Sequence, residues 1–185
     1  MQLLIYGSRD FAATVTELVT QCGHNAVGMI DDFNNGEGVL GSFNEVLKSH
    51  PPSDFGIALA IGYSNIPARW EAWLKIKDAG YQAPALVHPR AYVSESARIE
   101  EGVMIMAGAI VDVRARVGEI SVLWPGSCIN HDCNIHENTF ISPNATICGF
   151  SNVGANSFIG AGAVIVDHAQ VPKGSFVKML SRFVK

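Results

Sequence analysis

The chain has few charged residues and no long apolar run, and each shortage excludes a class of protein. Charged residues make up 16% of its 185 residues, and the formal net charge of −4 gives no reason to expect nucleic-acid binding. No apolar stretch approaches the roughly 20 residues that a membrane-spanning helix needs. The apolar start, residues 1–7, is too short for a signal peptide because Arg9 and Asp10 interrupt it. These features predict a cytoplasmic protein with no membrane insertion.

Cysteines are also scarce. The chain has four of them, none in a CxxC spacing: Cys22, Cys128, Cys133 and Cys148. This pattern favours free structural thiols in a reducing compartment over a redox motif.

What the chain does have is a repeat of six residues. Every sixth position is aliphatic over a long stretch: Val87, Val93, Ile99, Ile105, Val111, Val117, Leu123, Ile129, Ile135, Ile141, Ile147, Val153, Ile159, Ile165, Val171 and Val177. The residue two positions before each is small, and Val103 is the one residue there larger than threonine or cysteine. A period of six fits neither a single strand nor a helix, and it is typical of a β-helix built from stacked hexapeptides.

The repeat also predicts which side chains are buried. Residues two apart on a strand share one face, so the aliphatic residue and the small one before it should both point inward. β-branched side chains suit such short strands because their χ1 angle is already restricted. A β-sandwich would instead show turn clusters every 8–12 residues and would lose this phase.

The first 80 residues alternate short strands and helices. We expect strands at residues 3–6, 26–30 and 56–61, and helices at 11–22, 43–50 and 66–79. This order predicts a parallel, doubly wound α/β sheet, whose ligands bind at the carboxyl ends of the strands.

Three loops should meet at that edge of the sheet. They contain Gly7 and Ser8, then Asp31 and Asp32, then Gly62. The glycine after the first strand would let backbone N–H groups approach a phosphate, and the paired aspartates could bind a ribose or a base. The alternative is that the aspartates form a solvated turn.

The hexapeptide pattern resembles the hexapeptide-repeat acyltransferase superfamily, whose left-handed parallel β-helix has three hexapeptides per triangular coil. With a Rossmann-like α/β region in front, the chain is similar to the bacterial sugar O-/N-acyltransferases that acetylate nucleotide-linked amino sugars or sialic acid. Residues 4–7, 29–32, 60–62 and 86–89 carry this resemblance in order. It implies a nucleotide-sugar-binding domain at 1–82, a β-helix acyltransferase domain at 83–178 and a C-terminal tail at 179–185.

The resemblance also implies a mechanism and its partners. It implies acetyl-CoA as the acyl donor and no metal. It also implies a nucleotide-sugar acceptor, which would be held by Gly7, Ser8, Asp31, Asp32 and Gly62. The family forms homotrimers with active sites between subunits, so a homotrimer is expected.

His131, Asp132 and Cys133 match the family's H-[DE]-C motif. His131 lies two residues after an inward aliphatic, which places it outside or at a corner, and histidine suits a general base near neutral pH. Asp132 would orient the imidazole, and Gly149, one coil later, would leave room for the thioester of the cofactor. The alternative is a surface histidine with no role.

Three departures from the family stand out. Arg9, Asp10 and Phe11 replace smaller residues, glycine and histidine of the first loop. Trp124 and Phe140 are expected near the site, where the family more often has asparagine and histidine. The last coils appear shortened, and the chain lacks a G-x-P-A tail.

Two other functions fit parts of the pattern. The first is a non-catalytic sugar-nucleotide binder or scaffold, which the departures favour. The second is a trimeric zinc enzyme of the γ-carbonic-anhydrase type, because His131 and His136 have a usable separation. Glu95 and Val113 occupy the places upstream of His131 where a third zinc ligand should lie.

Overall fold

The computed structural model describes residues 1–184, and the chain separates into two compact units, Met1–Pro84 and the part from Ala85 onward. Within the described chain, no helix combines the length and the apolar character needed to cross a lipid bilayer.

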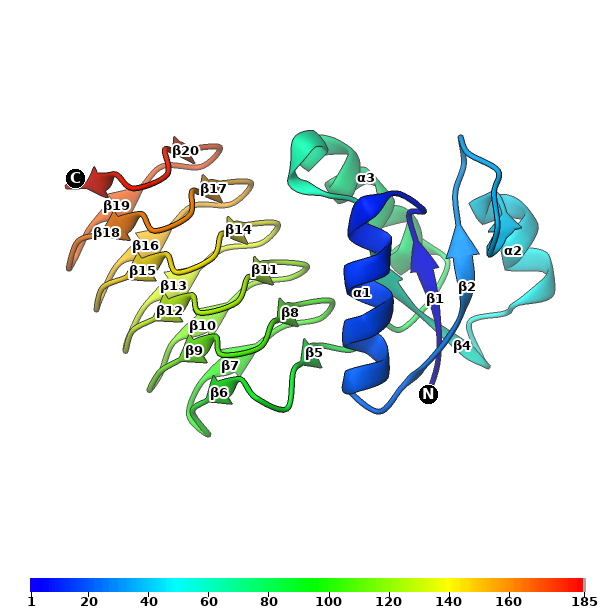
Figure 1. Ribbon diagram of the computed structural model, residues 1–185, viewed down its shortest axis with the longest axis horizontal. Helices are drawn as coiled ribbons and strands as arrows, with labels where there is room; N and C mark the ends of the chain where they lie inside the picture. Colours follow the sequence, from blue (N-terminus) through cyan, green and yellow to red (C-terminus); the bar gives the residue numbers. More distant parts are fainter. Residues whose placement is uncertain (185) are drawn as a thin grey trace. The chain divides into compact units, whose positions relative to one another are not determined.

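The first unit is a parallel four-stranded sheet with helices (Figure 1). Its strands, in the order β3-β2-β1-β4, are β1 (Gln2–Tyr6), β2 (Asn25–Ile30), β3 (Val39–Gly41) and β4 (Phe55–Leu59). Its helices are α1 (Asp10–Gln21), α2 (Phe43–Ser49) and α3 (Ile66–Asp78), and a short 3-10 helix, η1 (Tyr63–Asn65), precedes α3. The predicted α/β region is therefore confirmed. The edge strand β3 was not predicted, because three residues carry no readable period.

The sequence explains the packing of this unit. β1 is a central strand, and Leu3, Leu4 and Ile5 are at most 1% exposed because both of its faces are covered. In α1, Val15, Leu18 and Val19 are buried at helical spacing and pack the helix on β1 and β2. The carboxyl ends of β1, β2 and β4 consequently lie at one edge of the sheet.

The second unit is a stack of two-residue strands that form three parallel sheets. The first sheet contains β5 (Leu86–Val87), β8 (Met104–Ile105), β11 (Val122–Leu123), β14 (Phe140–Ile141), β17 (Phe158–Ile159) and β20 (Phe176–Val177). The second contains β6 (Tyr92–Val93), β9 (Ile110–Val111), β12 (Cys128–Ile129), β15 (Thr146–Ile147), β18 (Val164–Ile165) and β21 (Arg182–Phe183). The third contains β7 (Arg98–Ile99), β10 (Arg116–Val117), β13 (Asn134–Ile135), β16 (Asn152–Val153) and β19 (Gln170–Val171).

Paired residues in these sheets are 18 positions apart, which is one coil of three hexapeptides. This solenoid of about five turns confirms the predicted fold class and is consistent with the left-handed β-helix of the resembled superfamily. The predicted inward residues form its core: Ile129, Ile147 and Ile165, for example, stack in successive coils with no exposed surface. Cys133 fills an inward position as expected, and all four cysteines are free thiols.

From Gly102 to Leu180, one residue in each hexapeptide, at a corner of the coil, adopts a left-handed backbone conformation. These residues also recur at every sixth position: Gly102, Gly108, Arg114, Ile120, Gly126, Asp132, Asn138, Asn144, Phe150, Asn156, Gly162, His168, Gly174 and Leu180. Because a coil has 18 residues, Arg114, Asp132, Phe150 and His168 follow one another along a single edge of the prism. This edge lies between the second and third sheets.

The repeat continues beyond the predicted end of the β-helix. Ile165, Val171, Val177 and Phe183 keep the step of six without a missing coil, and β21 pairs with β18. Strand β21 therefore lies inside residues 179–185, for which the sequence predicted a tail. The aromatic Phe183 ended the aliphatic pattern but not the strand.

Candidate active site

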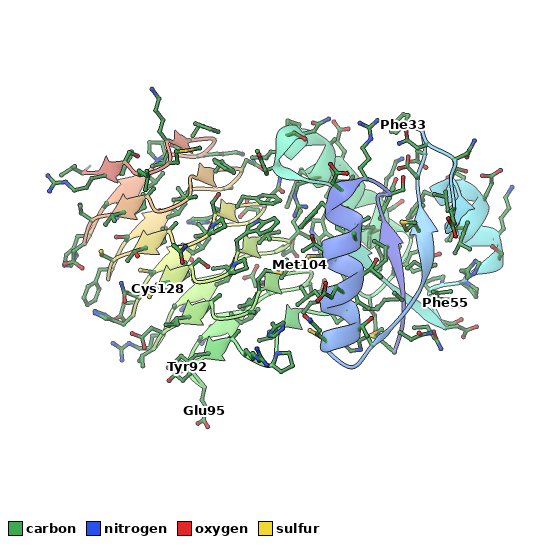
Figure 2. All side chains as sticks on the ribbon, in the orientation of Figure 1. Phe33, Phe55, Tyr92, Glu95, Met104 and Cys128 are labelled. Carbon is green, nitrogen blue, oxygen red and sulfur yellow. The ribbon has the colours of Figure 1, made fainter. Side chains whose placement is uncertain are left out.

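His131 and Asp132 form the turn between β12 and β13. His131 follows an inward isoleucine by two positions, and its side chain is 48% exposed, so the imidazole is accessible as the sequence predicted. The backbone N–H of Asp132 donates to the carbonyl of Val113 one coil earlier, at 2.9 Å, which fixes the height of the turn in the stack. Cys128, labelled in Figure 2, marks the strand that leads into this turn.

The carboxylate of Asp132 has two side-chain partners. It lies 3.0 Å from Nδ1 of His131, and Arg114 donates Nε to Oδ1 and Nη2 to Oδ2, each at 2.7 Å. The hydrogen bond from Arg114, and then the one from His131, lower the pKa of Asp132 to about 2. Asp132 is therefore ionised at neutral pH.

This ionisation decides which nitrogen of His131 is free. A carboxylate only accepts hydrogen bonds, so the 3.0 Å contact requires a proton on Nδ1 of the neutral imidazole. The other nitrogen, Nε2, then carries the lone pair. The pair can act as a general base whose tautomer is set by an aspartate.

Gly149 lies beside that free nitrogen. A Cβ atom at Gly149 would stand 2.9 Å from Nε2 of His131 and 3.1 Å from Oδ1 of Asp167. The glycine therefore keeps a small space open between the base and a carboxylate, close to where the sequence placed it. Phe150 packs edge-on against the His131 ring at 5.2 Å and stacks on His168 at 4.8 Å.

Sequence reasoning missed Arg114, Phe150, Asp167 and His168 as neighbours of the site. The length of a coil could have identified three of them, because Arg114, Phe150 and His168 lie one or two coils of 18 residues from Asp132 and so share its edge. The sequence also placed Trp124 and Phe140 near the site, and this was wrong for a single chain. Phe140 and the strand before Trp124 belong to the first sheet, which does not border the His131 turn.

The predicted residues of the α/β region meet at the carboxyl edge of its sheet, and the carboxylate of Asp31 is tied there by internal bonds. Asp31 is 8% exposed and accepts hydrogen bonds from Ser8 Oγ at 2.5 Å and from the backbone N–H groups of Phe33 and Asn34 at 2.9 Å. Burial raises the pKa of Asp31, but the hydrogen bonds from Ser8, Phe33 and Asn34 outweigh it and lower the pKa to about 2.

Asp32 is likewise engaged within the protein. It accepts hydrogen bonds from the Tyr6 hydroxyl at 2.6 Å, the Phe43 backbone N–H at 2.8 Å and the Lys75 ammonium at 3.2 Å. Burial raises the pKa of Asp32, but the hydrogen bonds from these three partners and the charge of Lys75 outweigh it, so the net shift is downward. Both aspartates thus join the loops of the edge to one another.

Gly7 and Gly62 both lie at the carboxyl edge of the sheet, but they differ in the space around them. Gly7 has φ +121°, and a Cβ there would lie 2.7 Å from the carbonyl oxygen of Ala60, so no other residue fits. Its own N–H donates to the carbonyl of Ile30 at 2.8 Å, within the sheet edge. Gly62 has open space around its Cα and leaves the start of η1 accessible. Phe33, which is 94% exposed directly after the aspartates, was not singled out by the sequence.

The Asp31 network predicts acid sensitivity of the N-terminal sheet. Because its pKa falls from 3.8 to about 2 on folding, Asp31 stabilises the fold above pH 4 by about 2 kcal/mol, and this contribution is lost as the pH falls to 2. The stability advantage of the native protein over Asp31→Asn should therefore shrink over that range. Amide hydrogen exchange of β1 measures it, and the exposed Asp54→Asn is the matched control. If the difference in stability between the native protein and Asp31→Asn did not change with pH, the lowered pKa of Asp31 would be contradicted.

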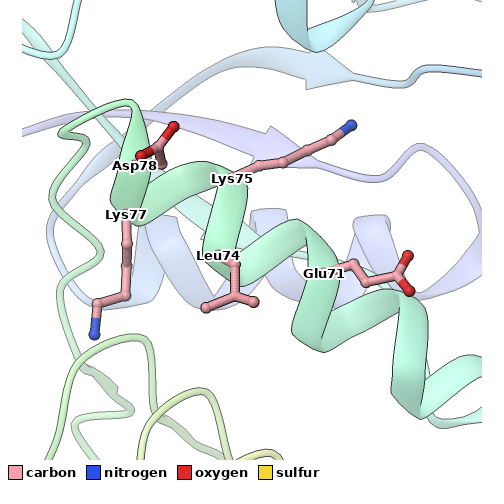
Figure 3. Close-up of a pocket in the computed structure, with 5 residues that line it drawn as sticks. All are labelled: Glu71, Leu74, Lys75, Lys77 and Asp78. Atoms are coloured by element: carbon pink, nitrogen blue, oxygen red, sulfur yellow. The ribbon is translucent and has the colours of Figure 1, made fainter.

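A separate pocket of about 740 Å³ lies along α3 (Figure 3). It is lined by Glu71, Leu74, Lys75, Lys77 and Asp78. None of the predicted binding residues lines it, although Lys75 also reaches Asp32. Among residues 1–184 of a single chain, no three histidine, cysteine or acidic side chains gather in a way that could hold a metal ion.

Two known families match the sequence. Residues 2–74 match the PglD N-terminal domain, and residues 132–167 match the bacterial transferase hexapeptide family (six repeats). A comparison with curated proteins gives no significant match. The chain is therefore similar to the PglD N-terminal domain in its first unit and to hexapeptide-repeat transferases in its second.

Solved structures of acetyltransferases are similar to the chain over nearly its whole length. The acetyltransferase domain of PglB from Neisseria gonorrhoeae FA1090 is 28% identical, with a TM-score of 0.91 over 99% of this chain and 91% of that one. The same domain in complex with acetyl coenzyme A is 28% identical, with a TM-score of 0.87 over 96% and 88%. A mutant of perosamine N-acetyltransferase from Caulobacter crescentus, in complex with CoA and GDP-perosamine, shares the fold at 24% identity, with a TM-score of 0.89 over 100% and 89%. The predicted resemblance to the hexapeptide-repeat sugar acyltransferases is confirmed, and the protein is an acyltransferase.

Proposed function

We propose that the protein transfers an acetyl group from acetyl-CoA to an amine or hydroxyl of a nucleotide-linked sugar, with His131 as the general base and Asp132 as its partner. The observation that carries this proposal is the 3.0 Å contact between an ionised Asp132 and Nδ1 of an exposed histidine. The gonococcal domain solved with acetyl coenzyme A supports the choice of acyl donor.

His131 has two tasks in this reaction. Its Nε2 takes the proton from the acceptor as the acceptor nitrogen or oxygen attacks the thioester carbonyl. When the tetrahedral intermediate collapses, the carbon–sulfur bond breaks and the imidazolium returns the proton to the leaving thiolate. Asp132 stabilises the imidazolium between the two steps, as a carboxylate does beside a catalytic histidine.

The nucleotide portion of the acceptor is assigned to the carboxyl edge of the N-terminal sheet. We propose that Gly7, Asp31 and Asp32 shape this edge, since their polar groups are occupied within it. The open start of η1 at Gly62 and the exposed ring of Phe33 are then left to contact the nucleotide, together with the hydroxyl oxygen of Ser8, whose proton is donated to Asp31.

The homotrimer also remains a proposal. The second sheet, which borders the His131 edge, carries exposed apolar side chains near both of its ends: Tyr92, Ile110 and Val164 are 58%, 41% and 37% exposed. A neighbouring β-helix on this face would bury them and enclose His131 in a cleft between subunits.

A binding and turnover experiment tests the function. Acetyl-CoA and a panel of UDP-, dTDP- and GDP-linked sugars should each be tested for a shift in melting temperature. Free thiol should be released only when acetyl-CoA and the right acceptor are both present. Binding of a nucleotide sugar with neither binding nor turnover of acetyl-CoA would reject the transferase in favour of a sugar-nucleotide binder.

Gly149→Ala is a sharper probe of the site. Its new Cβ would meet Cε1 and Nε2 of His131 at 2.8 and 2.9 Å, and the imidazole, as the end of a flexible side chain, would turn away. The turnover number should fall about 100-fold, since a displacement of about 1 Å at a reacting group costs that much. The melting temperature should hardly change, because the turn backbone accepts alanine. Unchanged turnover would show that the Gly149 side of His131 is not where the reaction occurs.

A further inference from the structure

Arg114 lies one coil before Asp132 on the same edge of the β-helix. Both residues have left-handed backbones, with φ of 57° and 59°, so their side chains leave the turn in the same way and meet. The guanidinium places Nε and Nη2 on the two carboxylate oxygens at 2.7 Å each. This forked geometry holds the plane of a carboxylate, which a single hydrogen bond does not do.

The fork determines how Asp132 meets His131. Oδ1 is occupied by Arg114, and Oδ2 accepts from both Arg114 Nη2 and His131 Nδ1. Asp132 belongs to an open turn, and its side chain is 19% exposed, so without a second anchor its carboxylate could rotate toward solvent. The Arg114 side chain is 63% exposed, and the fork supplies that anchor from the previous coil.

We propose that Arg114 is a positioning residue, which fixes the Asp132 carboxylate and thereby holds the proton of His131 on Nδ1 and leaves Nε2 free beside Gly149. This inference rests on the proposed function for its catalytic meaning. The geometric part of it, the control of the His131 tautomer, can be measured in the absence of any substrate.

The first test is the ring ¹⁵N spectrum of His131 in the full-length protein, assigned with His131→Gln. The native protein should show the neutral imidazole in the Nδ1–H form. Arg114→Gln should give a mixture of tautomers, and Arg114→Lys, which keeps the charge but not the fork, should give an intermediate mixture. The control is Arg116→Gln, which removes the same charge two residues further on and should leave the native spectrum. A single Nδ1–H form in Arg114→Gln would overturn the proposal.

The second test is kinetic. Arg114→Gln should lower kcat about 10–100-fold, the usual effect of removing a residue that orients a catalytic group, and should leave the KM for acetyl-CoA unchanged. Because Arg114 acts through Asp132, the double variant Arg114→Gln/Asp132→Asn should be no slower than Asp132→Asn alone. A raised KM with unchanged kcat, or additive losses in the double variant, would instead make Arg114 a substrate contact. If the native protein transfers no acetyl group, the proposed function fails, and the spectrum still decides the role of Arg114.

Discussion

Replacing His131 with alanine is expected to lower the turnover number for acetyl transfer by about 10²–10⁴-fold, the usual contribution of a positioned general base. The reason is that Nε2 is the atom that receives the acceptor proton, while Nδ1 is committed to Asp132 at 3.0 Å. Alanine removes both contacts without creating a buried cavity, because the imidazole is 48% exposed. The KM for acetyl-CoA should change little, and the loss should appear in kcat.

A second histidine of the same coil provides the control. His136 is 42% exposed and bonds to Asn134 and Asn152 on the third sheet, away from the turn that holds His131. His136→Ala should keep kcat within a few-fold of the native value, and both variants should melt near the native temperature. Turnover that survives in His131→Ala would remove this residue from the mechanism and leave the catalytic group to be found elsewhere.

The β-helix could be predicted almost completely from the sequence because one physical requirement repeats in it. Every coil must bury three aliphatic side chains, so the requirement is visible at every sixth residue from Val87 to Val177. The end of the β-helix was predicted too early, because Phe183 is aromatic and breaks the aliphatic pattern, although its strand still pairs with the previous coil. Within a single chain it also failed for Trp124 and Phe140, because the coil arithmetic did not separate the three sheets, and both belong to the side of the coil that does not border the His131 turn.

The candidate site was predictable in position but not in its contacts. His131 and Gly149 follow from the register of the repeat, whereas the clamp from Arg114 depends on a left-handed turn at an arginine, a residue type that does not signal this conformation. The same limit applies to Asp31 and Asp32. Their place at a strand end follows from the α/β order, but their internal partners depend on tertiary packing of Ser8, Tyr6 and Lys75.

The burial of the aliphatic residues inside the coil predicts an equally large effect of a single substitution, in this case on the stability of the fold. Ile147 has no exposed surface and stacks between Ile129 and Ile165 in the coils on either side. Ile147→Asp would place an unpaired carboxylate there, at a cost of at least several kcal/mol. Because domains are stable by only about 5–15 kcal/mol, the variant should be largely unfolded or insoluble.

The neighbouring residue separates this effect from a general intolerance of charge. Thr146 lies on the same strand, points outward and is half-buried, so Thr146→Asp should keep the native circular dichroism spectrum and unfold at a much higher urea concentration than Ile147→Asp. Ile147→Val, which only removes one methylene, should cost about 0.5–1.5 kcal/mol. Urea unfolding followed by far-ultraviolet circular dichroism ranks the three variants. If Ile147→Asp were soluble with a native unfolding midpoint, the side chain could not lie inside the coil. The whole inward register, including the placement of His131 at a corner, would then have to be shifted by one residue.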